Sequence, residues 1–287
     1  MAVSRRKIIS ASRRTDIPRF YYGWLQQVLG SGQVAVANPR FRDTTYTIDL
    51  QPENVHSLVL WSKDFGNVLK APGQLENYNL YFHYTINDYS RTLEPNVPEY
   101  GQTIRVLEGL LNRYAARQFT IRFDPLIISR QGENAPTYDE PQKARLNAFA
   151  RLCRDLDSLG MTACRVTTSY IAMYPHVKRR LSQAGVAIES YSDSQILSLF
   201  AEVAAIAQKH NITVYSCASP LLERVEGIEP GACIDASLLE NVFGGKLSKA
   251  RDSGQRQSCR CHKSSDIGDY RQKCGFSCIY CYSNTDL

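Results

Sequence analysis

Short runs of β-branched and aromatic residues alternate with longer segments of helical periodicity, and this alternation constrains the fold more than any other feature. It is typical of βαβ units that build a parallel sheet. The pattern predicts seven strands: Lys7–Ala11, Gln33–Ala37, Ser57–Ser62, Leu80–Thr85, Phe119–Phe123, Ala163–Thr168 and Ile212–Cys217. It predicts helices at Phe20–Leu29, Tyr100–Tyr114, Asp139–Leu159, Pro175–Ala184 and Ser194–His210. We predict an α/β fold, a (β/α) TIM-like barrel that is complete or partly open; the alternative is a doubly wound open sheet.

Two regions of different character divide the 287 residues. Residues 1–244 contain the predicted strands and helices, and such barrels commonly run to about 250 residues as one unit. Hydrophobic periodicity is lost from Gly244 onward, so we expect residues 245–287 to form an irregular, cysteine-rich tail. This tail is expected to pack at the barrel mouth and to depend on bound metal for its order.

Composition narrows the class of protein further. The chain has neither a signal-peptide pattern nor a run of 18 apolar residues, which predicts a cytoplasmic protein without a membrane partner. Cytosolic thiol buffers oppose disulfides, so its nine cysteines are expected to be reduced, buried or metal-bound. Residues 246–287 hold eight Lys and Arg against four Asp. Nucleic acid could bind such a basic tail, but the chain has no long basic run and no nucleic-acid motif to favour that partner.

Five of the nine cysteines lie in the last twenty-nine residues, as Cys259-x-Cys261 and Cys274-x3-Cys278-x2-Cys281. Structural zinc usually takes two Cys-x2–4-Cys knuckles, and the first of these spacings is too tight for one. A three-residue gap followed by a two-residue gap suits a cubane [4Fe-4S] cluster, in which each cysteine reaches a different iron. The spacing therefore favours an iron-sulfur cluster on the last three cysteines, with zinc as the alternative.

The motif Cys274-Gly-Phe-Ser-Cys278-Ile-Tyr-Cys281, flanked at its end by Tyr280 and Tyr282, resembles the radical S-adenosylmethionine (SAM) signature. It is most similar to the Tyr-Cys-Tyr version of spore photoproduct lyase-like proteins. More broadly, the chain resembles DUF1848, a family of uncharacterised bacterial proteins. That likeness rests on Ser-Arg-Arg-Thr-Asp-Ile-Pro at 12–18, the closing cysteine cluster, and residues 61–63, 83–85, 94–98, 122–125 and 266–268.

The radical SAM resemblance implies a role for each motif residue. Cys274, Cys278 and Cys281 would hold the [4Fe-4S] cluster, and the amino and carboxylate groups of SAM would chelate the fourth iron. A reductant such as flavodoxin or ferredoxin would allow cleavage of SAM to a 5'-deoxyadenosyl radical, and Tyr280 would lie against the adenine. The signature usually follows the first barrel strand. Here the tail has to bring the cluster to the barrel mouth.

The other tail cysteines leave two alternatives open. Cys259 or Cys261 donates a fourth ligand, which closes the cluster and turns a catalyst into an electron-transfer or structural centre. Alternatively, the pair forms an incomplete second site with His262. We expect an enzyme acting on an unknown substrate, with a fully cysteine-ligated [4Fe-4S] protein or a zinc-stabilised binding protein as rivals.

Polar residues follow the predicted strands at the end where active sites of barrels lie, which predicts a polar pocket. The candidate catalytic residues are Asp16, Lys63, His83, Arg122 and Asp124. The candidate cofactor-binding residues, besides Tyr280, are Arg13, Arg14 and Thr85, because arginine binds carboxylate or phosphate with two donors. Asn38 and Arg40 follow the second predicted strand.

Structural roles are the alternative for several of these residues. In these roles Arg122 and Asp124 form an internal salt bridge, and Asp16 caps a helix that begins near Arg19. Lys63 would be a solvated loop residue and His83 a hydrogen-bonded core residue. Buried small apolar roles, rather than ligand roles, are expected of Cys153, Cys164, Cys217 and Cys233.

Overall fold

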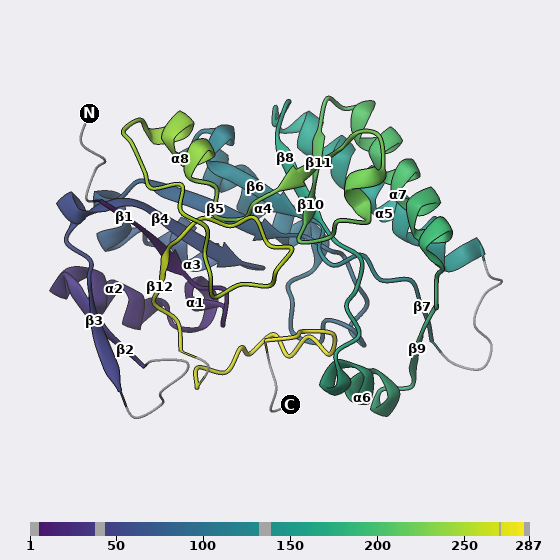
Figure 1. Cartoon of the computed structure of the whole chain (residues 1–287), viewed down its shortest axis with the longest axis horizontal. Helices are drawn as coiled ribbons and strands as arrows, with labels where there is room; N and C mark the ends of the chain where they lie inside the picture. Colours follow the sequence, from purple (N-terminus) through teal and green to yellow (C-terminus); the bar gives the residue numbers. More distant parts are fainter. Residues whose placement is uncertain (1–5, 38–43, 132–138, 270, 284–287) are drawn as a thin grey trace.

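A computed structural model of the chain describes residues 6–37, 44–131, 139–269 and 271–283 (Figure 1). At its centre lies an eight-stranded sheet whose neighbouring strands are all parallel. The strands are β1 (Lys7–Ala11), β4 (Val55–Ser62), β5 (Leu80–Thr85), β6 (Phe119–Arg122), β8 (Arg165–Thr168), β10 (Thr213–Cys217), β11 (Ile228–Gly231) and β12 (Ser265–Asp266). Their order across the sheet is β12-β1-β4-β5-β6-β8-β10-β11. The α/β class is confirmed.

Helices connect most of these strands in sequence. The α-helices are α1 (Ile17–Phe20), α2 (Tyr22–Ser31), α3 (Gly66–Lys70), α4 (Tyr100–Leu111), α5 (Asp139–Ser158), α6 (Pro175–Gln183), α7 (Asp193–Gln208) and α8 (Ala236–Phe243). Four 3-10 turns lie at Pro52–Asn54, Gly73–Asn77, Ala116–Gln118 and Leu222–Arg224. All five predicted helices are present with shifted ends, and the first is divided at Tyr21 into α1 and α2.

The two faces of the sheet are covered by different parts of the chain. Side chains alternate between the faces along each strand. Ile9 and Phe82 lie in the main core, which α2, α4, α5 and α7 share. Ile8 and Tyr81, the neighbours of those residues, pack instead with α8 and with Leu247 of the tail. The tail therefore covers part of the sheet.

A complete barrel, one of the two predicted forms, is wrong for the described residues. The strand order follows the chain from β1 to β11, as in a barrel, without the reversal of a doubly wound sheet. Closure would need β11 to pair with the opposite edge strand. In the described ranges that edge is β12, which pairs with β1 alone. The sheet is open, and α8 with the tail packs on one of its faces.

The tail is fastened to the first strand by a buried carboxylate. Asp266 of β12 accepts hydrogen bonds from the hydroxyls of Ser10 and Ser12, at 3.0 and 2.6 Å, and from the Arg13 amide at 3.0 Å. A side chain on Gly268 would place its Cβ only 2.1 Å from the Ser12 Oγ, so this close approach requires glycine. The tail thus belongs to the sheet as well as to the site.

The predicted strand at 33–37 exists but lies outside the main sheet. β2 (Gln33–Ala37) forms an antiparallel pair with β3 (Thr45–Asp49), and β7 (Ser129–Gln131) forms another with β9 (Val186–Ile188). The exposure of β2 alternates, as in a strand with one buried face. Asn38 and Arg40 fall outside the described residues. None of the described helices combines the length and apolar character needed to cross a membrane.

Candidate functional site

A cavity of about 540 Å³ lies at the carboxyl ends of the parallel strands. Residues at or just beyond the ends of seven strands line it, in chain order Ser12, Ser62, Thr85, Arg122, Ser169, Cys217 and Cys233. Tail residues between 254 and 283 line the rest. A polar pocket at the strand ends was expected, and every predicted site residue except His83 lines this one. The chemical roles of these residues stay predictions.

Cys274, Cys278 and Cys281, called here the motif cysteines, line the cavity together. An apolar cluster holds their loop: Phe276 is buried beside Val177 and Leu181 of α6. The ring of Phe276 meets that of Phe20 edge-on, with centroids 4.8 Å apart. Arg180 of α6 donates a hydrogen bond to the Cys281 carbonyl. The loop is therefore packed between α1 and α6, as the passage of the yellow tail toward α6 in Figure 1 also shows.

A buried cation lies beside the motif cysteines. The Lys63 ammonium donates to Glu94 Oε1 at 2.7 Å and to the Tyr280 hydroxyl at 3.1 Å. Tyr280 in turn donates to Glu94, and Asn87 donates to both. Burial would lower the pKa of Lys63, but Glu94, with a smaller contribution from the motif cysteines, raises it to about 12. The network thus holds a positive charge next to Cys278.

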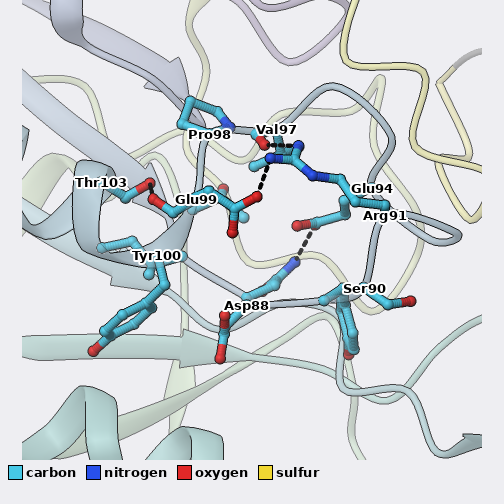
Figure 2. A pocket seen from close by; sticks show the side chains of 13 residues that line it. Asp88, Ser90, Arg91, Glu94, Val97, Pro98, Glu99, Tyr100 and Thr103 are labelled. Atoms are coloured by element: carbon cyan, nitrogen blue, oxygen red, sulfur yellow. Dashed lines mark hydrogen bonds and ion pairs between the residues drawn. The ribbon is translucent and has the colours of Figure 1, made fainter.

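Glu94 lines a second, smaller space rather than the large cavity. This pocket of about 200 Å³ is lined by residues between 85 and 103, and Figure 2 shows the Glu99 carboxylate pointing toward Arg91. Thr85 lines both spaces. Burial would raise the pKa of Glu94, but Lys63 and the other donors hold it below its ordinary value. A charged carboxylate of the smaller space is therefore bonded to Lys63 and Tyr280, which line the large cavity.

Asp16 combines a structural position with a place on the cavity wall. It caps α1 by accepting from the Arg19 amide at 3.1 Å, the alternative that its position in the sequence had left open. It also accepts from the Ser62 hydroxyl and the Lys63 amide, at 2.8 and 2.9 Å. Burial raises the pKa of Asp16 to about 7 against these three donors.

The arginines after β1 bind the tail. Arg13 pairs with Asp252 at 3.0 Å, and Arg14 donates to the Gly268 carbonyl at 2.6 Å. Within the described residues, Arg13 Nη1 and Thr15 Oγ1 are buried without a hydrogen-bond partner, and both residues line the cavity. These two atoms are available to a bound anion or a polar ligand.

A second group of cysteines lies on the same cavity. Cys217, Cys233, Cys259 and Cys261, called here the assembled cysteines, come from the end of β10, the segment after β11 and the tail. The sulfurs of Cys217 and Cys233 are 3.5 Å apart. Hydrogen bonds from Cys217 and Cys261 lower the pKa of Cys233 well below its ordinary value, and Cys261 lowers the pKa of Cys259 to about 6. Cys153 and Cys164 lie in the main core, as expected.

Arg122 is the buried cation of the assembled cysteines. Its guanidinium donates to Cys233 Sγ at 2.9 Å and pairs with Asp124, the internal pairing that the sequence had left open. His83 lies on β5, the strand next to that of Arg122. It stacks on Trp61, with ring centroids 4.1 Å apart, and its Nε2 is 2.7 Å from the Cys233 carbonyl oxygen. Burial lowers the pKa of His83 to about 3, so the ring is neutral.

The site contains residues that the sequence did not single out. Cys217 and Cys233 have no partner within a ligand-like spacing, so their meeting with the tail cysteines depends on the fold. Glu94 and Asn87 were not among the candidate site residues. Asn87 could have been found from its position, because it is a polar residue just after the predicted strand Leu80–Thr85, where the active sites of barrels lie.

The motif cysteines offer thiol donors, the ligand type of both zinc and iron-sulfur clusters. Among the described residues, no three His, Cys, Asp or Glu side chains are grouped as one metal ion needs. In a cubane each cysteine binds a different iron, so its ligands surround a cluster rather than one point. Burial raises the pKa of Cys274 to about 12 and that of Cys278 above its ordinary value. Metal binding therefore has to release their protons.

Comparison with known proteins identifies one match. A family model described as "Domain of unknown function (DUF1848)" matches residues 8–283, nearly the whole chain. No curated protein and no solved structure shows a significant match.

Proposed function

Because the chain belongs to the DUF1848 family, whose description gives no function, we propose a function from the site itself. The protein is an iron-sulfur enzyme of the radical SAM type, and Cys274, Cys278 and Cys281 hold a [4Fe-4S] cluster with one open iron. When bound and reduced, this cluster supplies reductive cleavage of SAM and so starts radical chemistry on a substrate. A reductant such as flavodoxin or ferredoxin and a cytoplasmic location belong to the same proposal.

One observation carries this proposal: the motif cysteines share a single cavity with the polar ends of the strands. Three thiols of one short loop supply three cluster ligands, and the cavity leaves room beside them for SAM and a substrate. We also interpret the consecutive strand order as that of a partly open barrel.

The surrounding residues have roles that follow from their contacts. Lys63 offsets the negative charge that thiolates and sulfide bring to the site, because it lies beside Cys278 and Cys281. Arg13 Nη1 and Thr15 Oγ1 are buried donors without partners in the described part of the chain, and they suit the carboxylate of SAM. Tyr280, held by Glu94, fixes the loop between the last two motif cysteines.

The closed-cluster alternative needs Cys259 or Cys261 as a fourth ligand to the same cluster. Both of these residues are hydrogen bonded within the assembled cysteines: Cys261 contacts Cys233 and Cys259. That arrangement supports an open fourth iron on the motif cluster.

The test is anaerobic purification, reconstitution with iron and sulfide, and electron paramagnetic resonance of the reduced protein with and without SAM. We expect a cluster signal that shifts when SAM is added, together with formation of 5'-deoxyadenosine. A cluster signal indifferent to SAM would favour an electron-transfer or structural centre. Zinc in place of iron would return the tail to a structural zinc site.

A further inference from the structure

Cys217 and Cys233 meet at the ends of two neighbouring strands. Cys217 is the last residue of β10 and pairs in register with Gly231, the last residue of β11. A side chain on Gly231 would place its Cβ only 2.4 Å from the Ser216 carbonyl oxygen, so the close approach of the two strands requires glycine here. Cys233 follows two residues later, and its Sγ lies 3.5 Å from that of Cys217.

This sulfur contact is close to the geometry of a disulfide. A disulfide bond is about 2.0 Å long, so the two sulfurs have to approach each other by about 1.5 Å. Cys233 lies in the short irregular segment between β11 and α8. A shift of this segment leaves the hydrogen bonds between β10 and β11 intact, because those end at Gly231. The fold therefore permits the bond without disturbing the sheet.

Hydrogen-bond donors prepare Cys233 as a thiolate. The thiol of Cys217 donates to it, and Arg122 Nη1 donates to its Sγ at 2.9 Å. The bond from Cys217 and the charge of Arg122 lower the pKa of Cys233 well below its ordinary value, and the same bond raises the pKa of Cys217. The thiolate is the nucleophile of thiol–disulfide exchange. Cys233 is therefore the attacking sulfur and Cys217 the resolving one.

The pair is also open to reactants. Both cysteines line the large cavity, together with Arg122 and the exposed tail residues 254–256. Cys217 itself is partly exposed. By contrast, Cys153 and Cys164 lie in the main core, where burial raises the pKa of both thiols to about 12. The pair thus combines a stabilised thiolate with access from the cavity.

We propose that Cys217 and Cys233 form a redox-active dithiol, a site of thiol–disulfide exchange with small disulfides that enter the cavity. Two sulfurs in mutual contact suit a bond between them, and the described residues contain no group of three ligands that would hold these sulfurs to a metal ion. This activity goes beyond the radical SAM function and does not depend on a cluster at the motif cysteines.

The reaction transfers two electrons from the pair to the small disulfide. The Cys233 thiolate attacks one sulfur of the small disulfide, whose S–S bond breaks, so that a mixed disulfide forms and a small thiolate leaves. This thiolate takes up the proton of the Cys217 thiol. The Cys217 thiolate then attacks Cys233 Sγ, which closes the intramolecular disulfide and releases the second small thiolate. A dithiol such as dithiothreitol reverses both steps.

The test treats the full chain, purified without oxygen and with any metal that it holds, with hydroxyethyl disulfide. The reaction is stopped with acid, the chain is unfolded, and free thiols are alkylated. Trypsin cleaves after Lys209, Arg224 and Lys246, which places Cys217 and Cys233 on the separate peptides 210–224 and 225–246. A disulfide between them then appears in mass spectrometry as a linked pair of peptides.

We expect the linked peptides from the folded wild type, and dithiothreitol should separate them again. Cys153 and Cys164 are the internal control and should be alkylated. Two matched variants identify the roles of the sulfurs. In Cys217→Ser the mixed disulfide has no resolving thiol, so Cys233 should keep one hydroxyethylthio group. In Cys233→Ser the attacking thiolate is absent, so Cys217 should remain a free thiol.

The proposal is overturned if both cysteines are alkylated in the folded wild type, or if Cys233 is linked to Cys261 instead of Cys217. It is also overturned if the linked peptides form as fast in concentrated urea, because the fold would then have no part in bringing the two sulfurs together. Circular dichroism reports whether each variant is folded. If a variant is unfolded, the wild-type linkage and its loss in urea decide the question.

Discussion

The two cysteine groups differ in how the chain brings them together, although both line the same cavity. The motif cysteines lie within eight residues of one loop, so their spacing is visible in the sequence. The assembled cysteines come from two strand ends and the tail, and their sulfurs meet only when β10, β11 and the tail are in place. Cysteines that lie on one loop can be recognised as a group from their spacing in the sequence. Cysteines that come from several segments can be recognised as a group only in the folded structure.

Each group has its own buried ion pair. Lys63 with Glu94 lies beside the motif cysteines, and Arg122 with Asp124 lies beside the assembled cysteines. The ammonium of Lys63 is a point charge at some distance from sulfur, while the guanidinium of Arg122 donates directly to Cys233. Variants of these residues can therefore separate the two groups.

The largest expected effect is loss of the proposed activity in Cys278→Ala. Removing one of the three proposed cluster ligands should reduce formation of 5'-deoxyadenosine from SAM below detection and lower the iron bound per chain. Product analysis and iron determination measure both. Cys153→Ala is the control and should keep full activity, since Cys153 lies in the main core. Equal activity in the two variants would show that Cys278 is no more important for the reaction than a core cysteine.

The next effect is on stability and comes from Glu94→Gln. It leaves the buried Lys63 without its anion, which should lower the free energy of unfolding by about 3–5 kcal/mol near pH 7. Because the folded pKa of Glu94 lies below its ordinary value of 4.5, its contribution is present above that pH and is lost as the pH falls through the folded pKa. Urea unfolding of both proteins should thus show a gap that shrinks in acid.

Glu99→Gln is the matched control for this change. Glu99 pairs with Arg91, but 69% of its side chain is exposed. Loss of this ion pair should lower the free energy of unfolding by less than about 1 kcal/mol at any pH. Similar losses in the two variants would show that the burial of the Lys63 pair has no energetic importance.

Arg122→Lys should act on the assembled cysteines alone. Lysine keeps the charge but cannot reach Asp124 and Cys233 together with a planar fork, so we expect the free energy of unfolding to fall by about 2–3 kcal/mol. Urea unfolding measures this change. Arg151→Lys, at a partly exposed pair with Asp88, is the control. Equal stability of Arg122→Lys and Arg151→Lys would contradict the role of the guanidinium.

The smallest effect compares the two tyrosines that flank Cys281. Tyr280→Phe removes a buried hydroxyl bound to Glu94, which should cost about 1.5 kcal/mol. Tyr282→Phe alters a side chain that is 57% exposed and should stay within about 0.5 kcal/mol of the wild type. Thermal unfolding measures both losses of stability. Equal losses in the two variants would show that the hydrogen bond to Glu94 does not stabilise the fold.

The sequence predicted the strands of the main sheet where the apolar pattern was strong. β1 and β5 match their predicted bounds because continuous apolar runs mark strands buried on both faces. β2 was assigned to the same sheet, since strand propensity does not say which partner a strand takes. β11 and β12 were missed because Ile228–Gly231 and Ser265–Asp266 are short and carry few apolar residues.

The same limit applies to the site. Lys63 and Tyr280 were named for different reasons, and their shared bond to Glu94 joins three segments that no local pattern connects. Arg13 and Arg14 were expected to bind a cofactor, and in the fold they also bind the tail. Residue type and strand position indicated the cavity, while the partners within it depended on tertiary structure.

The pairing of β12 with β1 has a consequence for synthesis on the ribosome. Ser10 and Asp266 are 256 residues apart, so one edge of β1 has no strand partner until the segment around Asp266 has emerged. An unpaired edge next to apolar residues such as Ile9 is a template for aggregation. Nascent chains arrested before Asp266 should therefore depend on chaperones, and the motif cysteines emerge only after the residues that cover that edge.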